Sequence, residues 1–230
     1  MKISIVTTAF NSGATLRDTI KSVLSQKYDD WQHIIVDGGS SDDTIDIIKE
    51  FEPSYKGRLK WISEPDKGIY DAMNKGIAMA DGDVIGILNS DDFYSSIFIL
   101  SKVAESFLAE KTLDAVYGDI HYVNDNDLSK CVRYYSSRFF RRWMMLMGYQ
   151  PAHPSFYCRK EIYDKYGNFD TDFKVAADFE HLLRLIYLHK IKTKYLNIDF
   201  VTMRMGGAST SGLQSHKKII EDHQNSFRKN

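Results

Sequence analysis

Residues 82–92 read GDVIGILNSDD, an apolar run that ends abruptly in polar and acidic residues. The segment 84–88, VIGIL, has the composition of a central strand that is covered on both faces. Asn89, Ser90, Asp91 and Asp92 follow directly, so the strand delivers two adjacent carboxylates to its C-terminal end. In an open α/β sheet, ligands bind at that edge.

The two neighbouring carboxylates repel each other unless a cation or a shared proton relieves the repulsion. Sites with only oxygen ligands favour Mg²⁺ or Mn²⁺, which usually keep some water and take further ligands from substrate phosphates. We therefore predict a Mg²⁺ or Mn²⁺ cofactor at Asp91 and Asp92. The alternative is that these acids cap a helix that Ser95 or Ser96 opens.

The first half of the chain alternates strands and helices. Strands are predicted at residues 3–10, 33–36, 59–63 and 84–88, and the segments between them carry apolar residues at helical spacing. This rhythm is typical of a mostly parallel sheet in an α/β protein. At 230 residues the chain is predicted to be a single domain, with residues 1–110 forming a ligand-binding half.

The second half, residues 111–230, is less regular and predicts a small antiparallel and helical elaboration. Strands are expected there at residues 115–123, 131–135, 155–158 and 194–203, and helices at 160–166, 178–189 and 214–227. A further helix is expected at residues 97–108, just before this half. A loop at 204–210, which contains Gly206 and Gly207, could close over a bound ligand or be a simple turn at a strand end.

Composition excludes several classes of protein. Lys and Arg number 30 against 31 Asp and Glu, so no overall basic field suggests a nucleic-acid partner. Cys131 and Cys158 have no neighbouring cysteine, which argues against thiolate metal sites and disulfide scaffolds and fits a reducing cytoplasm. No signal peptide or apolar run of ~18 residues is present, so the chain is expected to be cytoplasmic, with peripheral contact at the inner face of the membrane left open.

Residues 138–149, RFFRRWMMLMGY, combine three arginines with aromatic residues and methionines. The composition favours a core helix with arginines at its rim. The alternative is an amphipathic helix that makes peripheral contact with a membrane through lipid head groups.

Three further residues invite chemical interpretations. Asp37 ends the second strand as an acid does in dinucleotide sites, but the first turn lacks the glycine pattern that brings backbone against a pyrophosphate. His153 is either a metal ligand, an acceptor contact or a structural residue. Asp178 is either a favourable acid at a helix N-terminus or a general base in the same cleft as Asp91.

Four motifs together resemble the family 2 glycosyltransferases with the GT-A fold. They are TTAFNSGATLRDTIKSVLSQ, VDGGSSDDT, DAMNKGIAMADGDVIGILNSDD and ADFEHLLRL, and they span residues 2–184 in the order and spacing of that family. The resemblance implies a metal-dependent enzyme that moves a sugar from a nucleotide diphosphate sugar to an acceptor hydroxyl with inversion. It also implies a saccharide or lipid-linked acceptor in the assembly of a bacterial surface polysaccharide or glycolipid.

The resemblance carries over residue by residue, with three departures. The metal-binding D-x-D motif falls on Asn89, Ser90 and Asp91, so its first acid is an Asn and the metal is assigned to Asp91 and Asp92, with His153 as a further ligand. The acidic motif after the second strand has lost one acid, and the A-R-N motif has Met73 in place of its arginine. Asp178 corresponds to the catalytic base. The residues expected to bind the nucleotide sugar are Thr8, Phe10, Asp37, Gly38, Lys67, Asp71, Asn74, Lys75, Asn89, Ser90 and Asp91.

Two other functions use the same features. A glycoside hydrolase also employs paired carboxylates but needs neither metal nor nucleotide. A non-catalytic module would bind a nucleotide or sugar without turnover.

Overall fold

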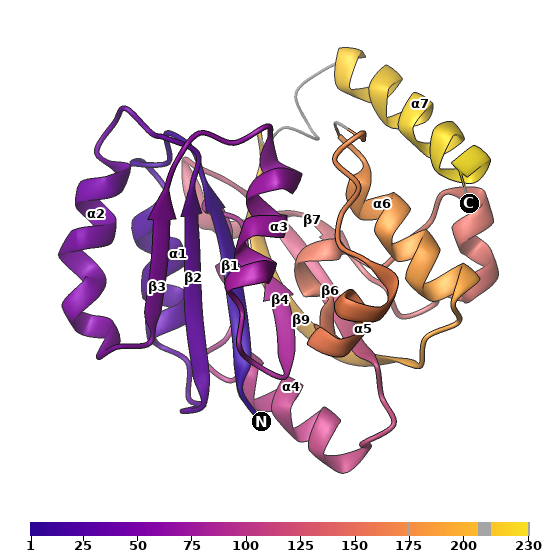
Figure 1. Cartoon of the computed structure of the whole chain (residues 1–230), viewed down its shortest axis with the longest axis horizontal. Coiled ribbons are helices and arrows are strands. Elements are labelled where there is room, and N and C mark those ends of the chain that lie inside the picture. The colour runs from indigo at the N-terminus through magenta and orange to yellow at the C-terminus, as the bar shows by residue number, and fades with distance from the viewer. Residues whose placement is uncertain (174, 207–212, 230) are drawn as a thin grey trace.

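A computed structural model describes residues 1–173, 175–206 and 213–229. In these residues one mixed sheet has the strand order β3-β2-β1-β4-β8-β6-β9-β5, and β7 pairs with β6 (Figure 1). The strands are β1 Ile3–Ala9, β2 Trp31–Asp37, β3 Leu59–Ser63, β4 Val84–Ile87, β5 Phe93–Tyr94, β6 Ala115–Asn124, β7 Asp127–Tyr135, β8 Tyr157–Arg159 and β9 Thr193–Arg204.

Helices flank this sheet. The α-helices are α1 Leu16–Leu24, α2 Thr44–Phe51, α3 Ile69–Met79, α4 Ile99–Ala109, α5 Lys160–Tyr166, α6 Ala177–Leu182 and α7 Leu213–Lys229. Three short 3₁₀ helices are η1 Glu52–Tyr55, η2 Arg142–Met147 and η3 His153–Ser155, and the π-helical segment η4 Leu183–Leu188 continues α6.

The first half of the sheet confirms the predicted parallel arrangement. Strand β1 pairs in parallel with β2 and β4, and β2 pairs in parallel with β3. In the second half β8 runs antiparallel to both β4 and β6, whereas β9 runs parallel to β6. The predicted antiparallel elaboration is therefore built onto the same sheet, and β4 lies near its centre with neighbours on both sides.

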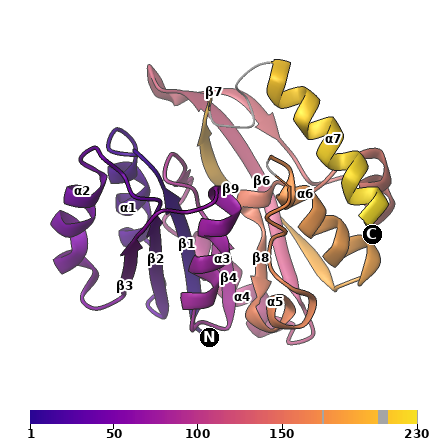
Figure 2. The same ribbon diagram turned by 45° about the horizontal axis from the view of Figure 1, so that its top comes forward.

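Each face of the sheet has its own hydrophobic core. Alternate residues of β1 show this, because Ile5 packs with the side chains of α1, α2 and α4, whereas Val6 packs with those of α3, α5 and α6. Figure 2 shows α3 and α5 on the near side of the strands, and α7 beside α6 at the end of the molecule remote from α2. Both faces are thus covered, as expected for a parallel sheet.

Helix α3 approaches the sheet closely at Gly76. A Cβ atom there would lie 2.3 Å from Cγ1 of the buried residue Val6. The absence of a side chain lets the helix pack directly on β1, and this contact holds the N-terminus of α3 beside the strand ends.

The prediction of a core helix at residues 138–149 is wrong. Only the short helix η2 forms there, and among its residues Met145 alone is buried, whereas Trp143 and Met147 are 59% and 61% exposed. The left-handed backbone of Gly148, with φ of 80°, ends η2 after about two turns. Residues 138–149 therefore present most of their apolar side chains to the surface.

Two other expectations need adjustment. The helix expected at 178–189 begins at Ala177 and changes to π-helical geometry at Leu183, a register change that apolar periodicity does not encode. Of the loop expected at 204–210, residues 207–210 lie outside the described residues. None of the described helices is long and apolar enough to cross a membrane.

Candidate active site

A cavity of about 810 Å³ opens at the C-terminal ends of β1 and β4. Its wall combines the segments after those strands with the first residues of α3 and α6, η3 and the end of β9. Eight of the predicted site residues line it, namely Thr8, Phe10, Gly38, Asn89, Ser90, Asp91, His153 and Asp178. The cavity lies at the sheet edge where parallel strands present ligand sites.

The two acids after β4 are desolvated. Burial raises the pKa of Asp92 well above its usual range, and the adjacent Asp91 adds to the rise. Burial likewise raises the pKa of Asp91, the more accessible of the two. Within the described residues, Oδ1 of Asp92 and Oδ1 of Asn89 are buried without a hydrogen-bond partner.

This set of oxygen atoms fits a divalent cation. Mg²⁺ and Mn²⁺ prefer oxygen ligands, and a cation would compensate two carboxylates whose charge burial disfavours. The alternative of helix capping is wrong, because α4 begins at Ile99 after Phe98 and has no side-chain cap. Asp91 and Asp92, with the oxygen of Asn89, are the residues that could hold the predicted metal.

His153 does not join these acids. The described residues contain no cluster of three or more His, Cys, Asp or Glu side chains arranged to hold a metal ion. His153 is 7% exposed, and its ring lies edge-on to Phe169 with centroids 5.3 Å apart. Burial lowers its pKa, while the nearby Asp178 opposes that shift. The sequence assigned His153 to the metal, but η3 holds it on the side of the cavity where Asp178 lies.

Hydrogen bonds from α1 fix the turn that carries the acids. The hydroxyl of Thr19 donates to the carbonyls of Ser90 at 3.0 Å and Asp92 at 2.7 Å. The hydroxyls of Ser12 and Ser90 are 2.8 Å apart. The polar residues that follow β4 are therefore held by the helix that follows β1.

Arg204, at the end of β9, is a cationic residue of the cavity wall whose contacts the sequence did not indicate. Its guanidinium donates to the carbonyl of Asp91 at 2.7 Å and pairs with Asp18 at 2.5 Å and Asp125 at 3.0 Å. In the sequence, Arg204 lies 113 positions from Asp91 and 186 positions from Asp18. The only signal available in the sequence was an arginine at the end of a predicted strand.

Asp178 stands in the first turn of α6 and lines the cavity. The hydroxyl of Tyr70 lies 3.3 Å from its Oδ1 and donates to the carbonyl of Val175 at 2.5 Å. The side-chain amide of Gln150 donates to its Oδ2 at 3.3 Å. Both contacts are long, so the carboxylate is oriented and its oxygens keep lone pairs for a further hydrogen bond.

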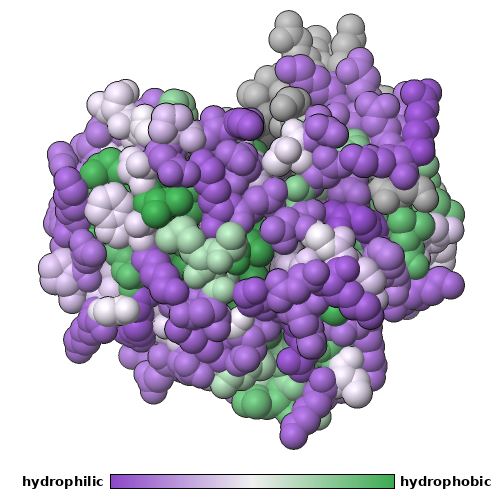
Figure 3. Space-filling view, viewed as in Figure 1, coloured by the Kyte–Doolittle hydropathy of each residue, from purple (hydrophilic) through white to green (hydrophobic). Residues whose placement is uncertain are grey.

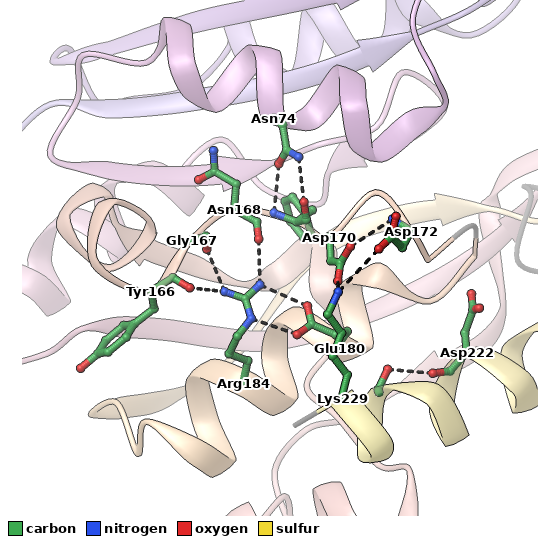
Figure 4. Close-up of polar contacts among 12 residues, drawn as sticks. Asn74, Tyr166, Gly167, Asn168, Asp170, Asp172, Glu180, Arg184, Asp222 and Lys229 are labelled. Carbon is green, nitrogen blue, oxygen red and sulfur yellow. Dashed lines mark hydrogen bonds and ion pairs between the residues drawn. The ribbon is translucent and has the colours of Figure 1, made fainter.

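A polar network supports the helix that carries Asp178 (Figure 4). The Arg184 guanidinium pairs with Glu180 at 2.9 Å and donates to the carbonyls of Gly167 and Asn168 at 3.1 and 2.7 Å. The Asn74 side chain joins this loop to α3, since it donates to the Phe169 carbonyl at 2.8 Å and accepts from its N–H at 3.0 Å. Asn74 therefore connects α3 to the loop before α6 and is not part of the cavity lining.

The other predicted donor-binding residues also lie outside the lining of the cavity. Asp37 is buried and accepts hydrogen bonds from Ser63 at 2.7 Å and from the N–H groups of Gly39 and Ser40 at 3.0 and 2.9 Å. Lys75 pairs with Glu64 at 2.8 Å and with Asp71 at 3.5 Å. The carboxylate of Asp71 also accepts the backbone N–H of Lys67, whose side chain is exposed. These residues shape the turns beside the cavity, and their contact with a donor stays a prediction.

The model of the family "Glycosyl transferase family 2" matches residues 4–175. The chain belongs to this family. An "uncharacterized glycosyltransferase" of Mycobacterium tuberculosis is 34% identical over 184 residues, which cover 79% of this chain and 68% of the relative. A "PGL/p-HBAD biosynthesis glycosyltransferase" of the same species is 27% identical over 209 residues, covering 90% of this chain and 79% of the relative.

Solved structures agree with the GT-A fold of this glycosyltransferase. S. aureus TarS in complex with UDP has a TM-score of 0.73 and 16% identity, over 98% of this chain and 65% of that chain. The mannosyltransferase PcManGT from Pyrobaculum calidifontis, in complex with GDP-Man and Mn²⁺, has a TM-score of 0.74 and 15% identity, over 99% and 64%. This chain thus spans about two thirds of the length of either structure.

Proposed function

We propose that this family 2 glycosyltransferase transfers a sugar from a nucleotide diphosphate sugar to an acceptor hydroxyl with inversion at the anomeric carbon. The observation that carries the proposal is that Asp91 and Asp178 line one cavity from different halves of the chain. The first belongs to a desolvated pair of acids and the second retains acceptor capacity. One cavity therefore contains a candidate for stabilising the leaving group, Asp91, and a candidate for removing the proton of the acceptor hydroxyl, Asp178.

The donor binds, in this proposal, at the ends of β1 and β4. Phe10 is 64% exposed at the cavity and offers a ring face to a nucleotide base, while Thr8 and Ser90 offer hydroxyls. Asp91 and Asp92, with Asn89, hold Mn²⁺ or Mg²⁺ near the diphosphate. When bound, the metal supplies positive charge to the departing nucleoside diphosphate. The structures of TarS with UDP and of PcManGT with GDP-Man and Mn²⁺ support this assignment by fold alone.

The acceptor enters from the side of Asp178, which removes the proton of the attacking hydroxyl. A second cavity of about 220 Å³ adjoins there and shares Tyr122, His153 and Asp178 with the first. Tyr135, Gln150 and His223 complete its polar and aromatic lining. Aromatic faces beside hydrogen-bonding groups suit a saccharide, so we place the acceptor sugar in this second cavity.

The proposed role is the assembly of a surface polysaccharide or glycolipid on a saccharide or lipid-linked acceptor. The mycobacterial relative named for PGL/p-HBAD biosynthesis supports the glycolipid class. The two free cysteines support a cytoplasmic location.

The test is the melting temperature of the protein with UDP, GDP, CDP or dTDP, each with Mn²⁺ and with a chelator. At a nucleotide concentration of about 100 Kd, binding adds about 2.7 kcal/mol, which corresponds to a rise of roughly 5–10 °C for a chain of this size. One nucleotide should raise the melting temperature only with Mn²⁺, and Asp91→Asn should remove that rise. Absence of any metal-dependent rise would reject the proposed donor site.

A further inference from the structure

Residues 138–149 are held firmly at both ends although they form little regular structure. The N–H of Ser137 donates to the buried carboxylate of Asp119 at 2.7 Å, and the hydroxyl of Tyr135 donates to the carbonyl of Gln150 at 2.6 Å. Between these ends the Met145 side chain is fully buried. The backbone is therefore fixed, and the outward direction of the remaining side chains is a property of the fold.

Five large apolar side chains point outward from this segment. Their exposed fractions are 75% for Phe139, 59% for Trp143, 51% for Leu146, 61% for Met147 and 53% for Tyr149. Figure 3 shows hydrophobic surface at the right-hand edge of the molecule, where Figure 1 draws this part of the chain below α7. Single exposed apolar residues are ordinary, but a contiguous group marks an interaction site.

Three exposed arginines accompany these side chains. Arg138, Arg141 and Arg142 form no ion pair with any acid in the described part of the chain. Arg141 instead donates to the carbonyl of Phe140 at 2.9 Å. The whole chain has a net charge of −1, so this concentration of cations is a local feature.

We propose that residues 138–149 dock onto the surface of a bilayer that contains anionic lipids. The aromatic and aliphatic side chains enter the boundary between head groups and acyl chains, while the arginines bind lipid phosphates. The unpaired charges favour this occupant over an apolar protein partner, because arginines left in a dry interface would lack counter-ions.

The position of the segment connects this surface to the proposed acceptor site. Gln150 directly follows Tyr149 and donates to the carboxylate of Asp178 at 3.3 Å. A docked molecule therefore holds the proposed base close to the lipid head groups. This step rests on the proposed function and narrows its acceptor to a sugar or hydroxyl carried on a membrane lipid.

Vesicle sedimentation tests the docking. Wild-type protein should bind vesicles of phosphatidylcholine with 30% phosphatidylglycerol, about tenfold or more better than phosphatidylcholine alone, and added NaCl should weaken binding. The triple variant Arg138→Gln, Arg141→Gln, Arg142→Gln should lose roughly a hundredfold, because each cation near an anionic surface contributes about fivefold. The matched control is the triple variant Lys27→Gln, Lys49→Gln, Lys111→Gln. It also removes three exposed cations that form no ion pair among the described residues. This control should bind vesicles as the wild type does. Equal loss in both variants, or no vesicle binding, would overturn the proposal.

Tryptophan fluorescence locates the contact. Of the three tryptophans, Trp31 is buried and Trp61 is half-buried, whereas Trp143 is exposed. Brominated lipids should quench wild-type fluorescence, and Trp143→Phe should abolish that quenching, while Leu108→Ser, at a site of equal 59% exposure, should leave it unchanged. Quenching that persists in Trp143→Phe would overturn the assignment to this segment.

The nucleotide-dependent melting rise, measured on the same arginine variant, separates the two proposals. If the arginine variant keeps the nucleotide-dependent rise in melting temperature but loses vesicle binding, the docking surface is separate from the donor site. Vesicle binding without any nucleotide effect in the wild type would reject the donor site and leave the docking surface in place.

Discussion

The Asp178 carboxylate has two long hydrogen bonds and a place on the cavity wall, as a general base requires. We expect Asp178→Asn to lower sugar transfer by about 10²–10⁴-fold, because the amide cannot accept the hydroxyl proton. Nucleotide binding should persist, since Asp178 and the acids after β4 belong to different elements. Release of nucleoside diphosphate measures the first effect and the melting temperature the second. Asp46→Asn, on the exposed side of α2, is the matched control, and normal turnover in Asp178→Asn would remove the residue from the role.

His33 gives the stability of the protein a defined pH dependence. Its ring is buried between the hydroxyls of Thr7 at 2.8 Å and Tyr55 at 2.7 Å, and burial lowers its pKa to about 3. The unfolded chain binds a proton near pH 6.5, whereas the folded chain does not until about pH 3. The contribution of neutral His33 to the free energy of unfolding is therefore complete above pH 6.5. Between pH 6.5 and about pH 3 it declines by about 1.4 kcal/mol for each pH unit.

Urea unfolding at pH 7 and pH 5 measures this contribution. In His33→Gln the loss of unfolding free energy between the two pH values should be smaller than in the wild type by about 2 kcal/mol, because glutamine does not titrate. An identical loss in both proteins would show that His33 does not control this slope.

At the site, local motifs predicted the acids but not their surroundings. Asp91 follows an apolar run and Asp178 stands at the start of a predicted helix, and the structure brings both to one cavity. Arg204 and Tyr70 complete the setting through contacts with distant residues, which no local pattern encodes. His153 was misassigned for the same reason, because an isolated histidine in a turn carries no information on which side of a cavity it faces.

At the level of elements, α3 depends on a glycine that helix propensity alone disfavours. Gly76→Ala should ordinarily stabilise a helix by up to about 1 kcal/mol. Here the new methyl group would meet the Val6 side chain at 2.3 Å, so we expect a net destabilisation of about 1–3 kcal/mol. Chemical denaturation measures the change. Ala78→Gly, at an exposed position of the same helix, should cost only the propensity difference, and a stabilised Gly76→Ala would contradict the close packing.

Helix α7 holds the first turn of α6 through Asp222. Its carboxylate accepts the N–H groups of Val175 and Ala176, each at 3.0 Å, and the rings of Phe179 and His223 stack 3.8 Å apart. Asp222 is thus a positioning residue for Asp178. Asp222→Ala should lower the free energy of unfolding by about 1 kcal/mol, as loss of a helix cap does. It should also lower kcat while changing the KM for the donor little, because Asp222 positions Asp178 and does not contact the donor. Asp222→Asn keeps an acceptor oxygen and should restore most of kcat. A stability loss with unchanged kcat would limit Asp222 to a structural role.

The regular elements were predictable where period and burial agree. Strand β3 has the predicted bounds, and the strands and helices of residues 1–110 follow the pattern of apolar residues. The two-residue strand β5 and the segment 138–149 were not predictable, because neither has a period. Strand β5 exists through its pairing with β9, more than 100 positions later in the chain, and η2 exposes side chains whose composition suggests a core.

For the molecule as a whole, the two halves, residues 1–110 and 111–230, share one sheet. Strand β4 of the first half pairs with β8 of the second, and β5 pairs with β9. The core on each face likewise includes residues of both halves, such as Val6 with Phe179 on one face and Ile5 with Phe200 on the other. Separating the halves would expose the edge of β4 and both cores.

We therefore predict that the chain unfolds as one cooperative unit. The calorimetric and van't Hoff enthalpies of unfolding should agree, and near-UV and far-UV circular dichroism should give coincident transitions. Residues 1–110 expressed alone should lack a cooperative transition, because β4 would present unpaired backbone groups and an uncovered apolar face. Two separate transitions in the whole chain, or a folded 1–110 fragment, would show that residues 1–110 are an independent domain. In a single unit, ordering of the donor site also stabilises Asp178 and the acceptor side, so nucleotide and Mn²⁺ should shift the entire transition rather than a part of it.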